Sequence, residues 1–231
     1  MDEVSKSQID RLGDRLRAGN IDEEDLRLLD RYRLSFSKAY EFVVRKIRDD
    51  LRYEPTGRPA KSTTSISEKL RRETIRLTQI QDIAGCRIVT PDMLDQVLVV
   101  GELEYQFKGA IIIDRRDTPS HGYRAVHVIV RHSGKLVEIQ VRTALQHLWA
   151  ELSEKLADLI DPAIKYGGGG EKRPDILDKT SEMVAEAENL EWELTQIPKE
   201  DRPQTVDSRV EEFKARLFDL LKARIEALTG K

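Results

Sequence analysis

The stretch LVEIQVRT, residues 136–143, alternates strictly between apolar and polar side chains. This alternation predicts a half-buried β-strand with Glu138, Gln140 and Arg142 on one face. A carboxylate on that face could hold a metal ion or accept a proton, and an arginine could bind a phosphate through two parallel hydrogen bonds. On pattern alone, an amphipathic strand with its polar face in water is the simpler interpretation.

A second strand, predicted over 124–132, changes that balance because Ser133-Gly134 should join it to the strand at 135–142 as a hairpin. Its polar face would carry His127 and Arg131, continued at one end by Tyr123. Polar faces of paired strands form one continuous surface. A carboxylate, an amide, several cations and an aromatic ring on that surface are a plausible nucleotide site, in which the ring stacks on a base.

A second carboxylate, Asp82, stands just before a predicted buried strand at 83–90 that carries Arg87. Magnesium on nucleotide phosphates is usually bound by one or two carboxylates, with water and phosphate oxygens completing the shell. Asp82 and Glu138 could form such a pair. Alternatively, Asp82 is an ordinary residue at a turn or strand edge.

The elements around these strands indicate an α/β or α+β domain, with a mixed sheet of four or five strands in a helical setting. We expect a further strand at 109–116 and a loop at 54–64. The run of glycines at 167–170 is interpreted as a flexible linker rather than a phosphate-binding loop. Ser208 and Glu211 suggest a capping box for the last helix. Helices are predicted at 4–18, 22–52, 65–76, 92–104, 143–160, 175–197 and 208–228.

The charge of the chain is distributed unevenly. The formal net charge of the 231 residues is -3, yet residues 45–76 contain ten lysines and arginines against five acidic residues. A local basic excess in an acidic protein suggests a confined anion site. A solvated helix face would explain it equally well.

The composition and the N-terminal residues indicate the cellular compartment. The chain has 39% hydrophobic and 35% charged residues, and no apolar run long enough to cross a bilayer. Its N-terminus lacks the apolar core of a secretion signal, and a single cysteine, Cys86, fits a reducing environment. We therefore expect a cytoplasmic protein with no membrane partner.

Four motifs, GRPAKSTTSISEKL, DIAGCRIV, HGYRAVH and VEIQVRT, resemble in this order and spacing the RelA/SpoT synthetase domain. The resemblance covers roughly residues 40–160. It implies a nucleotidyltransferase-like mixed sheet of four or five strands surrounded by helices. It also implies a small alarmone synthetase, divided into N-terminal helices at 1–53, a synthetase core at 54–166 and a C-terminal helical extension at 167–231.

The implied activity is that of a magnesium-dependent GTP/GDP pyrophosphokinase. It would transfer pyrophosphate from ATP to the ribose 3′-hydroxyl of GDP or GTP, giving AMP and (p)ppGpp, the alarmone of the stringent response. The motifs imply that Asp82 and Glu138 bind magnesium, and that Glu138 also acts as the base. The implied ATP ligands are Arg58, Lys61, Ser65, Lys69 and Arg87. The implied acceptor ligands are Tyr123, which stacks on guanine, with His127, Gln140 and Arg142.

Two departures from the family pattern leave alternatives open. The spacing from Arg58 to Lys61 has one extra residue, and Pro119 stands where many relatives have a lysine. The acceptor could instead be the 3′ end of tRNA or an adenine nucleotide, as in toxic small synthetases. A catalytically silent nucleotide-binding module is a further alternative. Several small synthetases are homotetramers, which the resemblance suggests as an assembly here.

Overall fold

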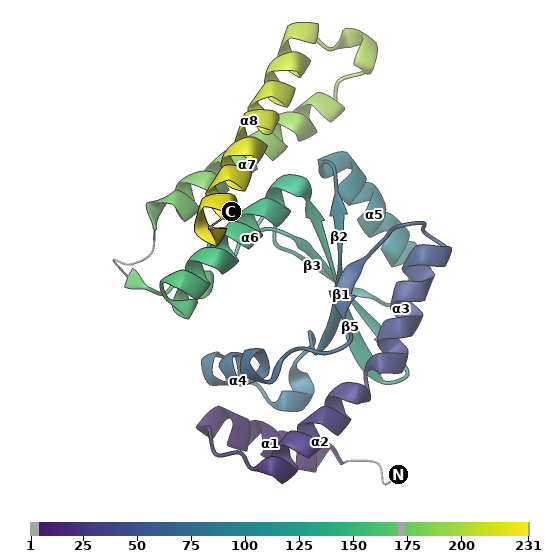
Figure 1. Ribbon diagram of the computed structural model, residues 1–231. Helices are drawn as coiled ribbons and strands as arrows, with labels where there is room; N and C mark the ends of the chain where they lie inside the picture. Colours follow the sequence, from purple (N-terminus) through teal and green to yellow (C-terminus); the bar gives the residue numbers. More distant parts are fainter. Residues whose placement is uncertain (1–4, 171–173, 231) are drawn as a thin grey trace. The chain divides into compact units, whose positions relative to one another are not determined.

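The computed structural model describes residues 5–170 and 174–230. Contacts along the chain group these residues into two compact units. The first unit comprises the chain up to Ile88 together with Leu103–Ile112 and Val128–Gln140. The second comprises Val89–Glu102, Ile113–His127 and the chain from Val141 onward. Figure 1 follows the elements of both along the sequence. The predicted division at residues 53 and 166 stays a prediction.

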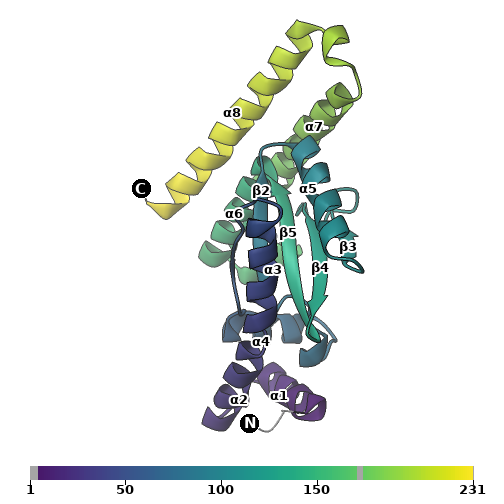
Figure 2. The same ribbon diagram turned by 90° about the vertical axis from the view of Figure 1, so that its right-hand side faces the viewer.

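Five strands form one mixed sheet in the order β1–β2–β5–β4–β3, which confirms the predicted fold class. β5 is the middle strand and lies between β2 and β4 (Figure 2). Helices surround the sheet. The strands are β1 (Thr56–Arg58), β2 (Ala84–Thr90), β3 (Ile111–Asp114), β4 (Val126–His132) and β5 (Lys135–Thr143).

The alternation of β5 is confirmed from Val137 to Val141, and at its end Arg142 and Thr143 are buried as well. Val137, Ile139 and Val141 are completely buried, so one face of the strand is part of the core. The hairpin to β4 turns through Ser133 and Gly134, whose φ angles are 48° and 76°. Two positive φ angles in succession give a turn with the twist of an antiparallel hairpin. The polar residues of β5 therefore share the opposite face, as predicted.

Helix α1 is the centre of the helical packing in the first unit. It contacts α2, α4 and the short helix η1. Arg15 on α1 joins Asp25 on α2 through two hydrogen bonds of 2.8 and 2.5 Å. The helices are α1 (Lys6–Ala18), α2 (Glu23–Leu34), α3 (Ser37–Asp49), α4 (Thr63–Arg72) and η1 (Leu77–Gln79), with α5 (Met93–Gln106) shared by both units.

Two predictions for this part of the chain are wrong. The helix expected at 22–52 is two helices, α2 and α3, because the Ser35 hydroxyl donates to the Tyr32 carbonyl at 2.5 Å and competes with the helical hydrogen bonds. The loop expected at 54–64 contains β1, which pairs antiparallel with β2. A Cβ at Gly57 would lie 2.5 Å from the Gly85 carbonyl oxygen, so only glycine permits this approach.

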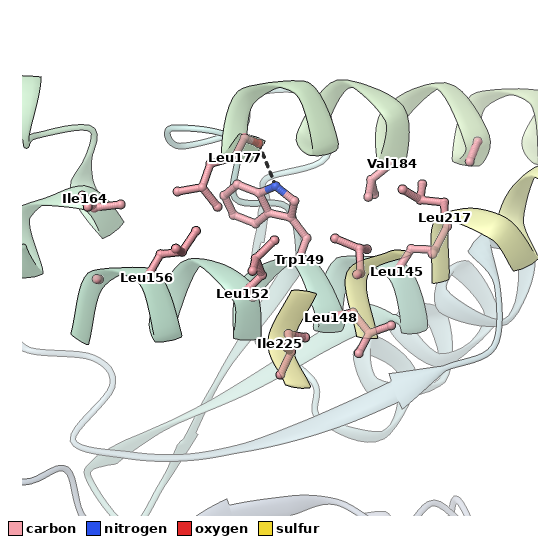
Figure 3. Packing of buried hydrophobic residues seen from close by; sticks show 14 residues of the cluster. Leu145, Leu148, Trp149, Leu152, Leu156, Ile164, Leu177, Val184, Leu217 and Ile225 are labelled. Atoms are coloured by element: carbon pink, nitrogen blue, oxygen red, sulfur yellow. Dashed lines mark hydrogen bonds between the residues drawn. The ribbon is translucent and has the colours of Figure 1, made fainter. Parts of the chain in front are cut away.

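Helix α6 is the centre of the second unit and contacts η2, α7 and α8. Figure 3 shows its apolar residues facing those of α7 and α8. At the middle, Trp149 is 3% exposed and donates from Nε1 to the Leu177 carbonyl at 2.9 Å. The elements are α6 (Ala144–Leu159), η2 (Pro162–Tyr166), α7 (Asp175–Thr195), η4 (Lys199–Asp201) and α8 (Gln204–Thr229).

The predicted capping box of the last helix is also wrong. Helix α8 begins at Gln204 after Pro203, and the Ser208 hydroxyl donates to the Gln204 carbonyl at 2.9 Å inside the helix. Proline just before a helix fixes a suitable φ without needing a side-chain cap. Over the described ranges, no helix has both the length and the apolarity needed to cross a membrane.

Candidate active site

The structure brings three predicted residues of the first unit into direct contact. Asp82 accepts hydrogen bonds from the Nζ of Lys61 at 2.5 Å and from the Nζ of Lys69 at 2.9 Å. All three side chains are largely shielded from water, and that of Asp82 is only 16% exposed. We call Lys61, Lys69 and Asp82 the lysine–aspartate cluster. It holds two positive charges around one negative charge.

The electrostatics of the cluster follow from burial and from this pairing. Burial by itself would raise the pKa of Asp82, but the charges of Lys61 and Lys69 outweigh it and lower that pKa to about 2. Burial would likewise lower the pKa of Lys69, but Asp82 outweighs it and the pKa of Lys69 is raised. Asp82 is thus a carboxylate, and Lys69 an ammonium ion, throughout the neutral range.

Local backbone structure fixes both lysines. The amide of Lys61 donates to the Ile83 carbonyl at 2.6 Å, which ties the residue to the start of β2 beside Asp82. Ser62 then caps α4, since its hydroxyl accepts from the amide of Ser65 at 3.2 Å. The Ser62 and Ser65 hydroxyls are also 2.8 Å apart. Helix α4 then carries Lys69 to the same carboxylate.

Glu138 and Gln140 lie together on β5. Gln140 donates from Nε2 to the Glu138 carboxylate at 2.7 Å. The charge of Glu138 also contributes to the raised pKa of Lys69, so this carboxylate lies within electrostatic reach of the cluster. Burial raises the pKa of Cys86 to about 12, and the charge of Glu138 adds to this. Cys86 is therefore a buried thiol without nucleophilic character.

Two predicted ATP ligands lie on the neighbouring strands. Arg58 is exposed on β1, and Arg87 is half-buried on β2, where it pairs with Thr56. Their position on adjacent strands fits a shared ligand. Their role in binding ATP stays a prediction.

The predicted acceptor residues of the second unit also meet. The Tyr123 hydroxyl lies 3.1 Å from Nε2 of His127 and accepts from Nη2 of Arg142 at 2.8 Å. The guanidinium of Arg142 is 4.9 Å from the centre of the Tyr123 ring, within the range of a cation–π contact. Arg142 is 4% exposed although it is charged. We call Tyr123, His127 and Arg142 the tyrosine cluster.

Each unit by itself offers groups suited to part of a nucleotide. The first unit holds two ammonium groups and two carboxylates, which suit phosphates and a cation. The second unit holds an aromatic ring that is hydrogen-bonded at its hydroxyl, which suits a base. In the described part of the chain, no group of three or more His, Cys, Asp or Glu side chains could enclose a metal by itself. A site with two carboxylates fits an ion that takes its remaining ligands from phosphates and water.

Sequence reasoning missed the residues that hold the turn before Tyr123. Arg124 donates from Nη1 to the Ser181 hydroxyl at 2.5 Å, although Ser181 lies on α7. It also missed Glu188 on α7, a buried carboxylate that accepts hydrogen bonds from Thr143 and Gln146 and whose pKa burial raises. Arg124 could have been noticed because it stands inside the HGYRAVH motif. Nothing in the sequence marks Ser181 or Glu188.

Comparisons with known proteins show the family of the chain. The model of the region found in RelA/SpoT proteins matches residues 57–157. The protein is 34% identical over 158 residues to the GTP pyrophosphokinase YjbM of Bacillus subtilis, covering 62% of this chain and 70% of that one. It is 45% identical over 123 residues to the uncharacterized protein Rv1366 of Mycobacterium tuberculosis. That match covers 51% of this chain but only 43% of the mycobacterial protein.

Among solved structures, the small alarmone synthetase 1 of Bacillus subtilis bound to its product pppGpp matches with a TM-score of 0.53 and 26% identity. The match covers 76% of this chain and 98% of that chain. A second crystal structure of the small alarmone synthetase 1 of Bacillus subtilis gives a TM-score of 0.51 at 27% identity. Motifs, sheet and relatives agree, and the chain belongs to the RelA/SpoT family.

Proposed function

We propose that the protein is a magnesium-dependent pyrophosphokinase that transfers pyrophosphate from ATP to the ribose 3′-hydroxyl of GDP or GTP. The observation that carries this proposal is the lysine–aspartate cluster. Two ammonium groups, those of Lys61 and Lys69, share a single carboxylate and are largely shielded from water. A triphosphate would bring enough negative charge to engage both lysines.

On the ATP side, Lys61 and Lys69 would turn from Asp82 to the phosphate oxygens. Asp82, released from its lysines, would then be available together with Glu138 to hold magnesium. Two carboxylates suit that ion, because magnesium on phosphates needs only one or two protein ligands. When bound, magnesium would neutralise charge that develops on the transferred group.

On the acceptor side, the tyrosine cluster supports nucleoside binding. The Tyr123 ring is fixed at its hydroxyl by His127 and Arg142, so it would give a base a rigid stacking surface. Gln140, the remaining predicted acceptor ligand, is oriented by its hydrogen bond to Glu138. This bond supports the proposal, because it would keep Gln140 beside Glu138 when an acceptor is bound.

The reaction balances with these groups. The 3′-oxygen of the acceptor forms a bond to the β-phosphorus of ATP, the bond from that phosphorus to the α,β-bridging oxygen breaks, and AMP leaves. Glu138 takes the proton of the hydroxyl. Such a transfer depends on positioning and charge neutralisation rather than on a covalent intermediate. The protein supplies both from existing side chains.

The acceptor is identified in parallel reactions that contain magnesium and ATP labelled in its terminal phosphate. Each reaction contains one candidate acceptor: GDP, GTP, an adenine nucleotide or tRNA. The control is Glu138→Gln, which keeps an oxygen able to accept the hydrogen bond from Gln140 but loses the base. Label on GDP or GTP, absent with the variant, is the expected result. Label only on tRNA or an adenine nucleotide would keep the reaction and replace the acceptor. No label on any acceptor would overturn the proposal in favour of a silent nucleotide-binding module.

A second test concerns the lysines. Lys69→Gln should weaken binding of a non-hydrolysable ATP analogue with magnesium by about tenfold or more, since it removes one charge-assisted phosphate contact. The matched control is Lys46→Gln, which removes another lysine paired with an aspartate, Asp50, at 2.7 Å on exposed α3. Equal affinities for the two variants would remove the lysine–aspartate cluster from the ATP site.

A further inference from the structure

Tyr123, the aromatic residue of the tyrosine cluster, is the last residue of a tight turn. Ser120 and Tyr123 exchange backbone hydrogen bonds of 3.2 and 3.0 Å. Between them His121 and Gly122 have φ angles of 54° and 88°. A two-residue turn with both φ angles positive has a defined geometry, and its first position strains any residue other than glycine. We call residues 120–123 the tyrosine turn.

Helices α6 and α7 press directly on this turn. A Cβ at Gly122 would lie 2.8 Å from Cζ2 of Trp149 and 3.0 Å from Oγ of Ser181. Ser181 is 4% exposed, and its hydroxyl donates to the Gly122 carbonyl at 2.9 Å. Arg124 adds a hydrogen bond from Nη1 to the Ser181 carbonyl at 3.0 Å. The turn is thus hydrogen-bonded to α7 and in van der Waals contact with α6.

The glycine run holds the other side of the turn. Gly167 ends the short helix η2 with a φ angle of 75°, and its amide bonds back to Ala163 and Ile164. Its backbone passes against the ring of His121. A Cβ at Gly167 would overlap that ring and stand only 2.6 Å from its Cγ. We predicted that this run is a flexible linker. The close contact between Gly167 and the His121 ring gives its first residue a packing role instead.

We propose that Gly167 and Ser181 are positioning residues for the acceptor. They hold the tyrosine turn between the glycine run and α7, and so fix the direction in which Tyr123 presents its ring. This inference rests on the proposed function, because it assigns Tyr123 to the acceptor. It extends that function by making Gly167 and α7 the supports of the residue that would stack on the acceptor. Neither residue touches the nucleotide; both act through the turn.

The test compares two glycine-to-alanine substitutions at positions with nearly the same positive φ angle. Gly167→Ala adds a Cβ into the His121 ring, whereas Gly134→Ala, at a φ angle of 76°, adds one where no atom lies within 4 Å. We expect Gly167→Ala to raise the KM for GDP about tenfold, because a shift of Tyr123 by about 1 Å would misplace the acceptor. The KM for ATP should change less than twofold, because the proposed ATP ligands belong to the first unit, whereas the tyrosine turn belongs to the second. Gly134→Ala should leave both constants unchanged.

Two further variants separate positioning from general loosening of the fold. Ser181→Ala removes the hydroxyl bonds to Gly122 and Arg124 without adding volume, and should raise the KM for GDP in the same selective way. In a His121→Gly background the ring is gone and glycine suits the positive φ, so Gly167→Ala should cause no further rise. Unfolding temperatures of all variants would be measured alongside.

The proposal is overturned if Gly167→Ala behaves as Gly134→Ala does, or if the KM values for ATP and GDP rise together. Hydrogen exchange of the amides in residues 120–124 gives a readout that does not need activity. Exchange there should be faster in Gly167→Ala and Ser181→Ala than in the wild type. If the wild type transfers nothing, the proposed function fails, and unchanged exchange would then independently refute the role of Gly167 and Ser181.

Discussion

Replacing Asp82 with asparagine tests the lysine–aspartate cluster in the absence of any ligand. Lys61 and Lys69 lower the pKa of Asp82 from its ordinary value of 3.8 to about 2 in the folded state. One pKa unit corresponds to about 1.4 kcal/mol, so the ionised carboxylate contributes about 2 kcal/mol to the free energy of unfolding. Asp82→Asn should lose this amount at pH 7, measured by urea unfolding followed by circular dichroism.

The sign of the pH dependence makes this prediction sharper. Because the folded pKa is depressed, the contribution is complete above the unfolded pKa and is lost as the pH falls toward the folded one. The difference between wild type and Asp82→Asn should therefore be constant from pH 7 to pH 5 and shrink to about 1 kcal/mol at pH 3.

The matched control is Asp50→Asn, which breaks a pair with Lys46 on the exposed face of α3 and should not change the unfolding midpoint measurably. The reasoning is refuted if Asp82→Asn is as stable as the wild type at pH 7, or if the difference does not depend on pH.

Three other substitutions test separate parts of the account. Burial raises the pKa of Glu188 above its ordinary 4.5, so the folded protein keeps a proton that the unfolded chain releases, and its stability falls as the pH rises. Glu188→Gln should remove this fall, which is checked by comparing the free energies of unfolding at pH 5 and pH 8. Gly57→Ala should destabilise the protein by about 1–3 kcal/mol, since its Cβ would push β1 away from Gly85 on β2. It should also weaken binding of the ATP analogue. Unchanged stability would contradict the close approach of the two strands. Arg142→Lys should weaken binding of labelled GDP by about tenfold, because lysine cannot both reach the Tyr123 hydroxyl and lie flat on its ring; equal affinity would mean that this fixation is irrelevant.

Patterns with a short period were the ones that the sequence could predict. β5 alternates because one of its faces is buried, and so Val137 and Glu138 could be assigned to opposite faces without a structure. The hairpin followed from Ser133-Gly134, since few residue pairs accept two positive φ angles. The predicted sheet of four or five strands proved to have five. Periodicity is set locally, and local rules are visible in a sequence.

Features that depend on distant contacts were not predictable from the residues alone. Lys61 and Asp82 are 21 positions apart, and only the fold brings Lys69 to the same carboxylate. The split of α2 and α3 is a local exception: it rests on the hydrogen bond from the Ser35 hydroxyl to the Tyr32 carbonyl, which the helical spacing of the apolar residues did not reveal. In the sequence, Gly167 is simply one residue of a glycine run. Glycine is needed there because a Cβ would overlap the ring of His121, which lies 46 positions earlier. The roles of the site residues came from the resemblance and stay to be tested.

The measurement that tests the central claim most directly is the stoichiometry of the products formed from ATP and GDP. Purified protein with magnesium would be incubated with both nucleotides, and the products identified and counted by mass spectrometry. Pyrophosphoryl transfer predicts one AMP for each guanosine nucleotide that gains two phosphates, with neither product formed by Glu138→Gln. ADP as the product of ATP, or AMP formed without a guanosine product, would contradict the account.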